Sequence, residues 1–513
     1  MERYRIRPTR GALLALTTTA ALLLTACGAG DGSHSSSDSK QSNGLPAPAP
    51  SRPQDEDSAT TPASDYLSTF ALDVDTASYG YARRTLADGE RPAPSTVRAE
   101  EFVNSFRQDY PTPDHNGFTV TVDGARTTDP NWSLVRVGLA TLPQSRLRST
   151  GGTPIADATA ERPPAALTFV IDVSGSMDEP GRLDLAKKSL DTMTDRLRDD
   201  DSVAIVAFSE HAEKVLPMTR LAGHRGEIHH AVDSLAALYS TNLGEGVETG
   251  YATAVEGLRK NATNRVVLIS DALANDGETD PDAILKRIDS DRREYGITLF
   301  GVGVGSDYGD ALMERLADKG DGHTTYVSDT ATANRVFCEQ LPQNIDLVAR
   351  DAKAQVAFDP HTVTDFHLIG YRDRKVADED FRDDRVDGGE VGPGHTVTAL
   401  YAVHTRPDTE GRLATATVRW LDPETRAPHE NTGAMETGAL HDSVWTASPR
   451  FQVTAVAAYF ADELGGGDYR IPGKPGLSTL HSRAAALART TEDQNVSDLA
   501  TAIREADPSN AAD

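Results

Sequence analysis

The chain has 513 residues with a formal net charge of -27, from 78 acidic and 51 basic side chains, and it contains two cysteines. Its length is too great for one ordinary hydrophobic core, so we expect two or more domains. Such an acidic surface repels the phosphates of nucleic acids, and we therefore expect no nucleic acid among the partners.

Residues 1–26 have the features of an export signal peptide. Four arginines among the first ten residues precede a short apolar segment, GALLALTTTAALLLTA, which ends directly before Cys27. The run Leu-Thr-Ala-Cys at 24–27 resembles the lipobox of bacterial lipoproteins; the alternative is a signal-anchor helix. The resemblance implies cleavage before Cys27, lipidation of that cysteine, and an extracytoplasmic protein that is lipid-anchored to the cell membrane.

Residues 27–65 are rich in Ser, Pro, Gly and Asp and offer almost nothing to bury, so we expect a disordered tether. Residues 66–162 read as a helical and β-rich N-terminal region, which starts with a strand and a helix and continues into alternating strand patterns. A second helix is expected near 95–106, with Ser95 as its N-cap. Its apolar face would carry Val97, Phe102, Val103 and Phe106.

Residues 163–347 alternate between strand and helix patterns. The strand candidates, several of which are apolar nearly throughout, are ALTFVIDV, SVAIVAFS, RVVLIS, ITLFGVGVG and TTYVS. Helical patterns lie between them: RLDLAKKSLDTMTDRLR, GEGVETGYATAVEGLRK, PDAILKRIDSDRREY and YGDALMERLADK. Such strands are typical of a parallel sheet with helices on both faces. We therefore predict an α/β, doubly wound, mostly parallel-sheet domain of Rossmann-like type.

The remaining chain returns to strand alternation and then to helices. Residues 348–448 predict a β-rich domain, and residues 449–513 a C-terminal helical region. One hypothesis is that the β-rich segments on both sides of the α/β domain pack together as one β-sandwich, into which the α/β domain is inserted.

The first strand of the α/β domain ends in FVIDVSGSM, where Asp172, Ser174 and Ser176 occupy alternate positions. In a doubly wound sheet, ligands bind at the carboxyl ends of the central strands. These hard oxygen donors suit Mg²⁺, Ca²⁺ or Mn²⁺ rather than zinc. Three donors are too few for such an ion, and the sequence offers two more: Thr241 ahead of a helix and Asp271 after RVVLIS.

This pattern resembles the metal-ion-dependent adhesion site (MIDAS) of von Willebrand factor type A (VWA) domains. The resemblance implies that Ser174 and Ser176 bind the ion directly and that Thr241 binds directly or through water, while Asp172 and Asp271 often act through water. A sixth position would accept an acidic residue of a partner protein. Mg²⁺ is the favoured ion, with Ca²⁺ or Mn²⁺ as alternatives.

Two positions depart from the VWA pattern. Ala272 stands where the family usually has glycine, and Tyr239-Ser240 stands where glycines usually precede the threonine. The flanking segments also resemble those of a bacterial family of VWA lipoproteins that is often labelled calcium-activated chloride channel homologue. The channel label finds no support in this sequence, which has no spanning segment after the signal peptide.

We therefore expect a cell-surface lipoprotein that mediates protein–protein interaction or adhesion through a bound cation, and not an enzyme. The alternative is a passive envelope scaffold or assembly protein with a degenerate metal site. A phosphatase reading of FALDVDTAS, with Asp73 as nucleophile and Asp75 as acid, lies outside the parallel α/β pattern that it requires. The acidic loop 377–390 departs from the EF-hand spacing, so we expect solvated or ion-paired side chains there.

Overall fold

The computed structural model describes residues 66–72, 75–143, 163–180, 182–271, 277–278, 280–304, 324–327, 336, 347–384, 386, 388–423 and 425–507. The predicted signal peptide, the predicted tether and Cys27 lie outside the described residues, as do Asp73 and Ala272.

A six-stranded sheet with the strand order β6-β5-β4-β7-β8-β9 forms the centre of the α/β domain. Strand β4 pairs in parallel with β5 and β7, and β7 and β9 pair in parallel with β8, whereas β6 is antiparallel to β5. The strands are β4 (Ala165–Asp172), β5 (Ser202–Phe208), β6 (Ala212–Arg220), β7 (Thr263–Ser270), β8 (Thr298–Val304) and β9 (Thr324–Val327).

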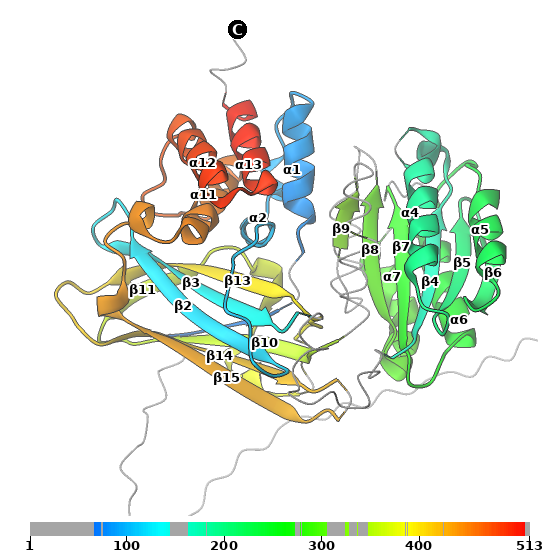
Figure 1. Cartoon of the computed structure of the whole chain (residues 1–513), viewed down its shortest axis with the longest axis horizontal. Helices are drawn as coiled ribbons and strands as arrows, with labels where there is room; N and C mark the ends of the chain where they lie inside the picture. Colours follow the sequence, from blue (N-terminus) through cyan, green and yellow to red (C-terminus); the bar gives the residue numbers. More distant parts are fainter. Residues whose placement is uncertain are drawn as a thin grey trace, which may run out of the picture. The chain divides into compact units, whose positions relative to one another are not determined.

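Helices cover both faces of this sheet, because successive side chains of each strand point to opposite sides. On one face, alternate residues of β4 such as Phe169 pack with helices α4 (Leu183–Arg196) and α5 (Arg225–Ser234). On the other, Val170 packs with helices α6 (Leu243–Glu256) and α7 (Pro281–Tyr295). The sequence of the domain therefore folds as a doubly wound α/β unit, as predicted (Figure 1).

All five predicted strands of this sheet are present, but β6 and α5 were not expected from the sequence. Most β6 side chains are partly or fully exposed, and the strand contains Pro217. Proline is tolerated in an edge strand, where a partner on the second side is not needed. Because an edge strand has little to bury, β6 lacks the apolar run that identifies the central strands.

Helix α6 lies unusually close to the sheet because of two glycines one turn apart. A Cβ atom on Gly246 would stand 2.6 Å from Cγ of Phe208, and one on Gly250 would stand 2.3 Å from Cγ2 of Val170. Only a residue without a side chain allows this approach. Thr241 precedes Asn242, the N-cap residue of α6, so the close packing of α6 also restricts the position of the predicted ligand loop.

Two antiparallel sheets form the β-rich body. One has the order β12-β1-β10-β14-β15 and the other β11-β13-β3-β2. Their apolar inner faces share one hydrophobic cluster, as in a β-sandwich. The strands are β1 (Leu67–Ala71), β2 (Phe118–Arg126), β3 (Trp132–Thr141), β10 (Arg350–Phe358), β11 (Val363–Leu368), β12 (Lys375–Val376), β13 (Thr396–Thr405), β14 (Arg412–Leu421) and β15 (Pro428–Glu436).

Both sheets combine strands from before and after the α/β domain. Strand β1 pairs with β10, with Phe70 opposite Ala354, and β3 pairs with β13, with Val137 opposite Ala399. This pairing confirms that the two β-rich flanks form one body around the inserted α/β domain. The acidic loop 377–390 contributes ion pairs to its surface, Arg382 with Glu430 and Asp384 with Arg419.

A helical layer packs on the outer side of the second sheet (Figure 1). It consists of α1 (Ala77–Ala87), α2 (Ala99–Asn104), α11 (Pro449–Leu464), α12 (Leu477–Thr491) and α13 (Gln494–Glu505). The three C-terminal helices agree with the sequence prediction. In the described part of the chain, no helix combines the length and apolar character needed to cross a membrane.

The prediction that Ser95 caps the second helix is wrong. Pro94–Thr96 form a separate 3-10 turn, Val97 is extended, and α2 begins only at Ala99, with Arg98 in the N-cap position. Proline favours the first position of such a turn because its φ is already fixed near the helical value. The apolar face was predicted correctly, because its four residues are all buried: Val97, Phe102, Val103 and Phe106.

Candidate metal centre

The two predicted aspartate ligands lie at the same edge of the α/β sheet. Asp172 is the last residue of β4, and Asp271 directly follows β7, with Ile171 opposite Ile269 in the parallel register. Both side chains are fully buried. Burial raises the pKa of Asp172, and the negative charge of Asp271 contributes to the same shift.

The two serines lie on the turn that leaves β4. Ser174 has an extended backbone and donates its N–H to Oδ1 of Asp172 at 2.8 Å. Ser176 lies in the 3-10 turn Gly175–Asp178, and its Oγ is 3.1 Å from Oγ of Ser174. The alternate spacing in the sequence thus brings two hydroxyls together directly beyond the first carboxylate.

Hydrogen bonds tie the loop that carries Thr241 to the same edge. Leu238 N–H donates to the carbonyl of Val173 at 2.6 Å, and Asn242 N–H donates to the carbonyl of Ser209, the residue after β5, at 2.7 Å. Thr241 lies between these two anchors and is 2% exposed. Asn242 then caps α6, since its side chain accepts the N–H of Glu245 at 3.2 Å. These bonds hold the loop of Thr241 beside the ends of β4 and β5.

The carboxyl group of Asp172 is held in a fixed position. Its Oδ2 accepts the hydroxyl of Ser270 at 2.5 Å, while Oδ1 accepts the N–H of Ser174. Burial raises the pKa of Asp172 from 3.8 to about 6; the hydrogen bonds from Ser270 and Ser174 oppose this shift, and the charge of Asp271 adds to it. A nearby cation would favour the ionised form of this buried acid.

Sequence reasoning missed Arg182, which also belongs to this edge. Arg182 is 2% exposed, and its Nη1 lies 2.8 Å from Oδ2 of Asp271 and 3.0 Å from the carbonyl oxygen of Ser176. Its Nη2 lies 2.7 Å from Oε2 of Glu179. One signal in the sequence could have identified it. Arg182 immediately precedes α4, where a positive charge is unfavourable to the helix dipole unless acidic groups compensate for it.

These residues fit a hard divalent cation. The site offers two hydroxyl groups 3.1 Å apart and two buried carboxylates, all oxygen donors of the kind that Mg²⁺ and Ca²⁺ prefer. No group of three or more His, Cys, Asp or Glu side chains in the described part of the chain could hold a metal. A cation at this edge would therefore depend on serine and threonine hydroxyls as well as carboxylates.

The loop with the unusual Tyr239-Ser240 sequence adopts a strained turn. Ser240 has φ of 59°, in the left-handed region that favours glycine. Leu238 is 53% exposed and Tyr239 is 87% exposed, so the tip of the loop presents two large apolar side chains to solvent.

The phosphatase alternative receives no support from Asp75. Its carboxylate is buried in an ion pair with Arg374, with Oδ2 and Nη2 3.1 Å apart. Asp75 also follows β1, an antiparallel strand of the sandwich, rather than a strand of the parallel sheet. The arrangement is that of a structural ion pair.

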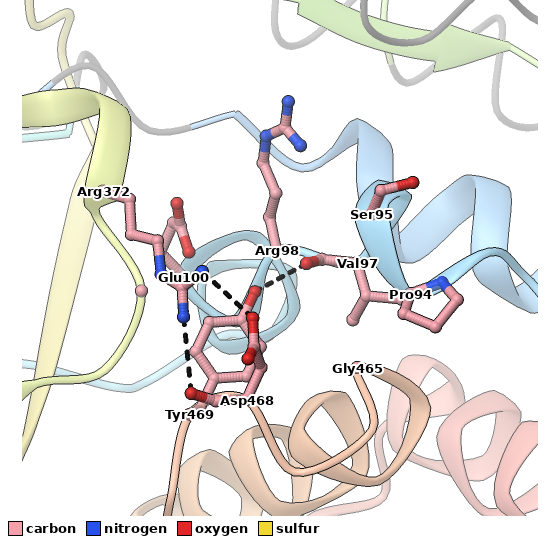
Figure 2. Close-up of a pocket in the computed structure, with 10 residues that line it drawn as sticks. Pro94, Ser95, Val97, Arg98, Glu100, Arg372, Gly465, Asp468 and Tyr469 are labelled. Carbon is pink, nitrogen blue, oxygen red and sulfur yellow. Dashed lines mark hydrogen bonds and ion pairs between the residues drawn. The ribbon is translucent and has the colours of Figure 1, made fainter.

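Away from the candidate metal site, a pocket of 240 Å³ lies between the start of α2, the turn with Arg372 and the segment after α11 with Tyr469 (Figure 2). Charged side chains at the pocket's rim pair with each other: Nη1 of Arg372 lies 3.1 Å from Oδ2 of Asp468. The guanidinium of Arg372 also lies over the ring of Tyr469. Burial raises the pKa of Glu100 on its wall. Oε2 of Glu100 has no hydrogen-bond partner among the described residues, but it is shielded from solvent. A ligand in this pocket could not reach that oxygen without a rearrangement.

Three family models match the chain. The model of the von Willebrand factor type A domain matches residues 166–339, one described as von Willebrand factor matches residues 52–135, and one described as Uncharacterized protein YfbK, C-terminal, matches residues 343–499. VWA domains in general mediate protein–protein interaction or adhesion and commonly bind divalent metal ions. None of these descriptions names an enzyme family.

The chain is 34% identical over 433 residues to Uncharacterized protein YfbK of Escherichia coli (strain K12), covering 81% of this chain and 74% of that protein. It is 28% identical over 194 residues to Uncharacterized protein sll0103 of Synechocystis, covering 38% of this chain and 44% of that protein. The solved structure of von Willebrand factor type A from Catenulispora acidiphila aligns with 79% of this chain and 93% of that chain, at 18% identity and a TM-score of 0.47. By its VWA domain and its similarity to YfbK over most of both sequences, the chain belongs to a bacterial family of VWA-domain proteins.

Proposed function

We propose that this protein binds a divalent cation at Asp172, Ser174, Ser176, Thr241 and Asp271 and uses the bound cation to recognise an acidic side chain of a partner protein. Mg²⁺ is the favoured ion, with Ca²⁺ or Mn²⁺ as alternatives. We further propose that Cys27 carries a lipid anchor that holds the protein at the outer face of the cell membrane.

The observation that carries the proposal is the pair of hydroxyls beyond β4. Ser174 and Ser176 bring their Oγ atoms within 3.1 Å of each other, whereas Asp172 is already engaged by Ser270 and by the N–H of Ser174. A hydroxyl group carries no net charge, so it offsets little of the positive charge of an ion that it binds. An ion held in this way remains attractive to a carboxylate from another molecule.

The exposed loop tip supports a protein partner over a small ligand. Leu238 and Tyr239 are large apolar side chains in contact with water, and their loop is bonded to the turn that holds the proposed ion. Tyrosine is enriched at the centres of protein interfaces, where it buries a large area at low cost in conformational entropy. We expect these two side chains to pack against the partner beside its acidic residue.

Calorimetric titration of Mg²⁺, Ca²⁺ and Mn²⁺ into the metal-free protein tests the cation site. We expect saturable binding of one ion, abolished when both Ser174 and Ser176 are replaced by alanine. A matched control is Ser482→Ala, which removes the exposed hydroxyl of a helical serine in α12 and should leave binding unchanged. Absence of binding by the native protein would refute the cation site and favour the passive scaffold.

The role of the ion in partner binding needs a second measurement. Envelope proteins captured by the native protein should be lost on chelation with EDTA and in the double serine variant. Tyr239→Ser should weaken capture while the ion titration stays unchanged, because Tyr239 is 87% exposed and is not one of the proposed ligands. Equal capture with and without EDTA would contradict a cation-dependent interaction.

A further inference from the structure

Arg182 places a permanent positive charge inside the proposed cation site. Its side chain is among the largest fully buried ones in the described part of the chain, and arginine does not lose its proton in proteins. A buried guanidinium is tolerated only where anions and hydrogen-bond acceptors surround it. Two of the acceptors of Arg182, the carboxylate of Asp271 and the carbonyl oxygen of Ser176, belong to residues of the proposed site.

The contacts of Arg182 join the two sides of this site. Nη1 reaches Oδ2 of Asp271, at the end of β7, and also the carbonyl oxygen of Ser176, on the turn after β4, at 2.8 and 3.0 Å. Nη2 lies 2.7 Å from Oε2 of Glu179, whose side chain is 64% exposed. Through these bonds, one side chain fixes both the carboxylate and the hydroxyl-bearing turn that the ion would need.

A guanidinium and a divalent ion at this edge compete for the same negative charge. Each of them is stabilised by Asp271, and the two cations repel each other across a buried space in which charges are screened much less than in water. The guanidinium therefore stabilises the metal-free site and opposes entry of the ion. Its removal would take away one cation that competes with the ion for Asp271.

We propose that Arg182 is an internal cation that holds the metal-free site in shape and lowers the affinity of the site for a divalent ion. The inference rests on the proposed cation site, because it assigns a regulator to that same site. Arg182 acts through Asp271 and Ser176 and is thus a positioning residue. It keeps ion binding weak enough to respond to the ion concentration or to a partner carboxylate that completes the site.

The test compares ion binding by the native protein with that of Arg182→Gln and Arg182→Met. Both variants are neutral, and methionine also keeps much of the buried apolar stem. We expect Mg²⁺ and Mn²⁺ to bind about tenfold or more tightly in both variants, because a repelling charge is removed. We also expect both variants to melt at a lower temperature in EDTA, with the difference reduced by saturating Mg²⁺.

Two controls separate charge from shape. Arg182→Lys keeps a positive charge, so its affinity should stay closer to the native value than that of the neutral variants. Arg412→Gln removes an exposed arginine of β14, paired with Glu436 at 2.7 Å, and should not change ion binding. If Arg182 only supported the fold, its replacement by Gln or Met would weaken ion binding instead of strengthening it.

The outcomes distinguish this inference from the proposed function. Unchanged or weaker ion binding in both neutral variants, with binding by the native protein intact, overturns the inference alone. No binding by the native protein or by any variant overturns both. Binding by the neutral variants but not by the native protein supports the inference, and it refutes cation binding by the native protein.

Discussion

Replacement of Asp172 by asparagine should stabilise the metal-free protein at neutral and alkaline pH. Burial raises the pKa of Asp172 from 3.8 to about 6, so the folded state binds this proton more tightly than the unfolded state does. The group therefore costs stability as the pH rises above 3.8, and the full cost is present above pH 6. A difference of about two pKa units corresponds to about 3 kcal/mol at pH 8 and roughly half of that at pH 5.

Asparagine can keep the local hydrogen bonds. Its carbonyl oxygen can accept the N–H of Ser174, and its amide group can donate to the hydroxyl of Ser270, which accepts as well as donates. The lost charge is then the main difference between the two proteins. We expect Asp172→Asn to be more stable than the native protein by about 1–3 kcal/mol at pH 8 in EDTA, with a smaller gap at pH 5.

Urea unfolding at several pH values in EDTA measures this gap. Titrating groups far from Asp172 contribute equally to both proteins, so their contributions cancel in the difference. Asp365→Asn, at an exposed position of β11, is the matched control and should show no such gap. Addition of Mg²⁺ should stabilise the native protein more than the variant. A gap that does not change with pH, or a variant less stable at pH 8, would refute the reasoning.

Three further predictions concern packing, a buried charge and the anchor. Gly250→Ala should destabilise the protein by about 1–3 kcal/mol in urea unfolding and weaken ion binding, because the new methyl group would lie 2.3 Å from Cγ2 of Val170 and push α6 outward. Arg136→Met should cost about 2 kcal/mol, measured in the same way, because it breaks the 2.6 Å ion pair with the partly exposed Asp123. Cys27→Ser should abolish incorporation of labelled fatty acid and release the protein from the membrane fraction; retention of the label would contradict lipidation at this cysteine.

The central strands and the spacing of the proposed ligands could be predicted from the sequence. Strands β4 and β7 contain long apolar runs because both faces of the sheet are covered there, and this pattern is readable without a structure. The order of Asp172, Ser174 and Ser176 after such a strand places them at its carboxyl end. Asp271 follows by the same reasoning, because parallel strands end at one edge.

Other features depend on contacts between distant parts of the chain. The edge strand β6 has little to bury, so its sequence carries no apolar signal. The capping role predicted for Ser95 fails because Pro94 starts a separate turn and α2 begins only at Ala99. Local preferences do not decide between two starting points that are so close together.

The sequence by itself therefore determined the class of the fold and the chemistry at the strand end, because periodicity and donor type are local properties. Only the tertiary structure decided that strands from both flanks share two sheets, because register depends on which distant partner completes each hydrogen-bond ladder. It also decided the place of Arg182. The position of Arg182 before α4 indicates that acidic groups must lie near it, but only folding brings Asp271, 89 positions along the chain, within 2.8 Å of it.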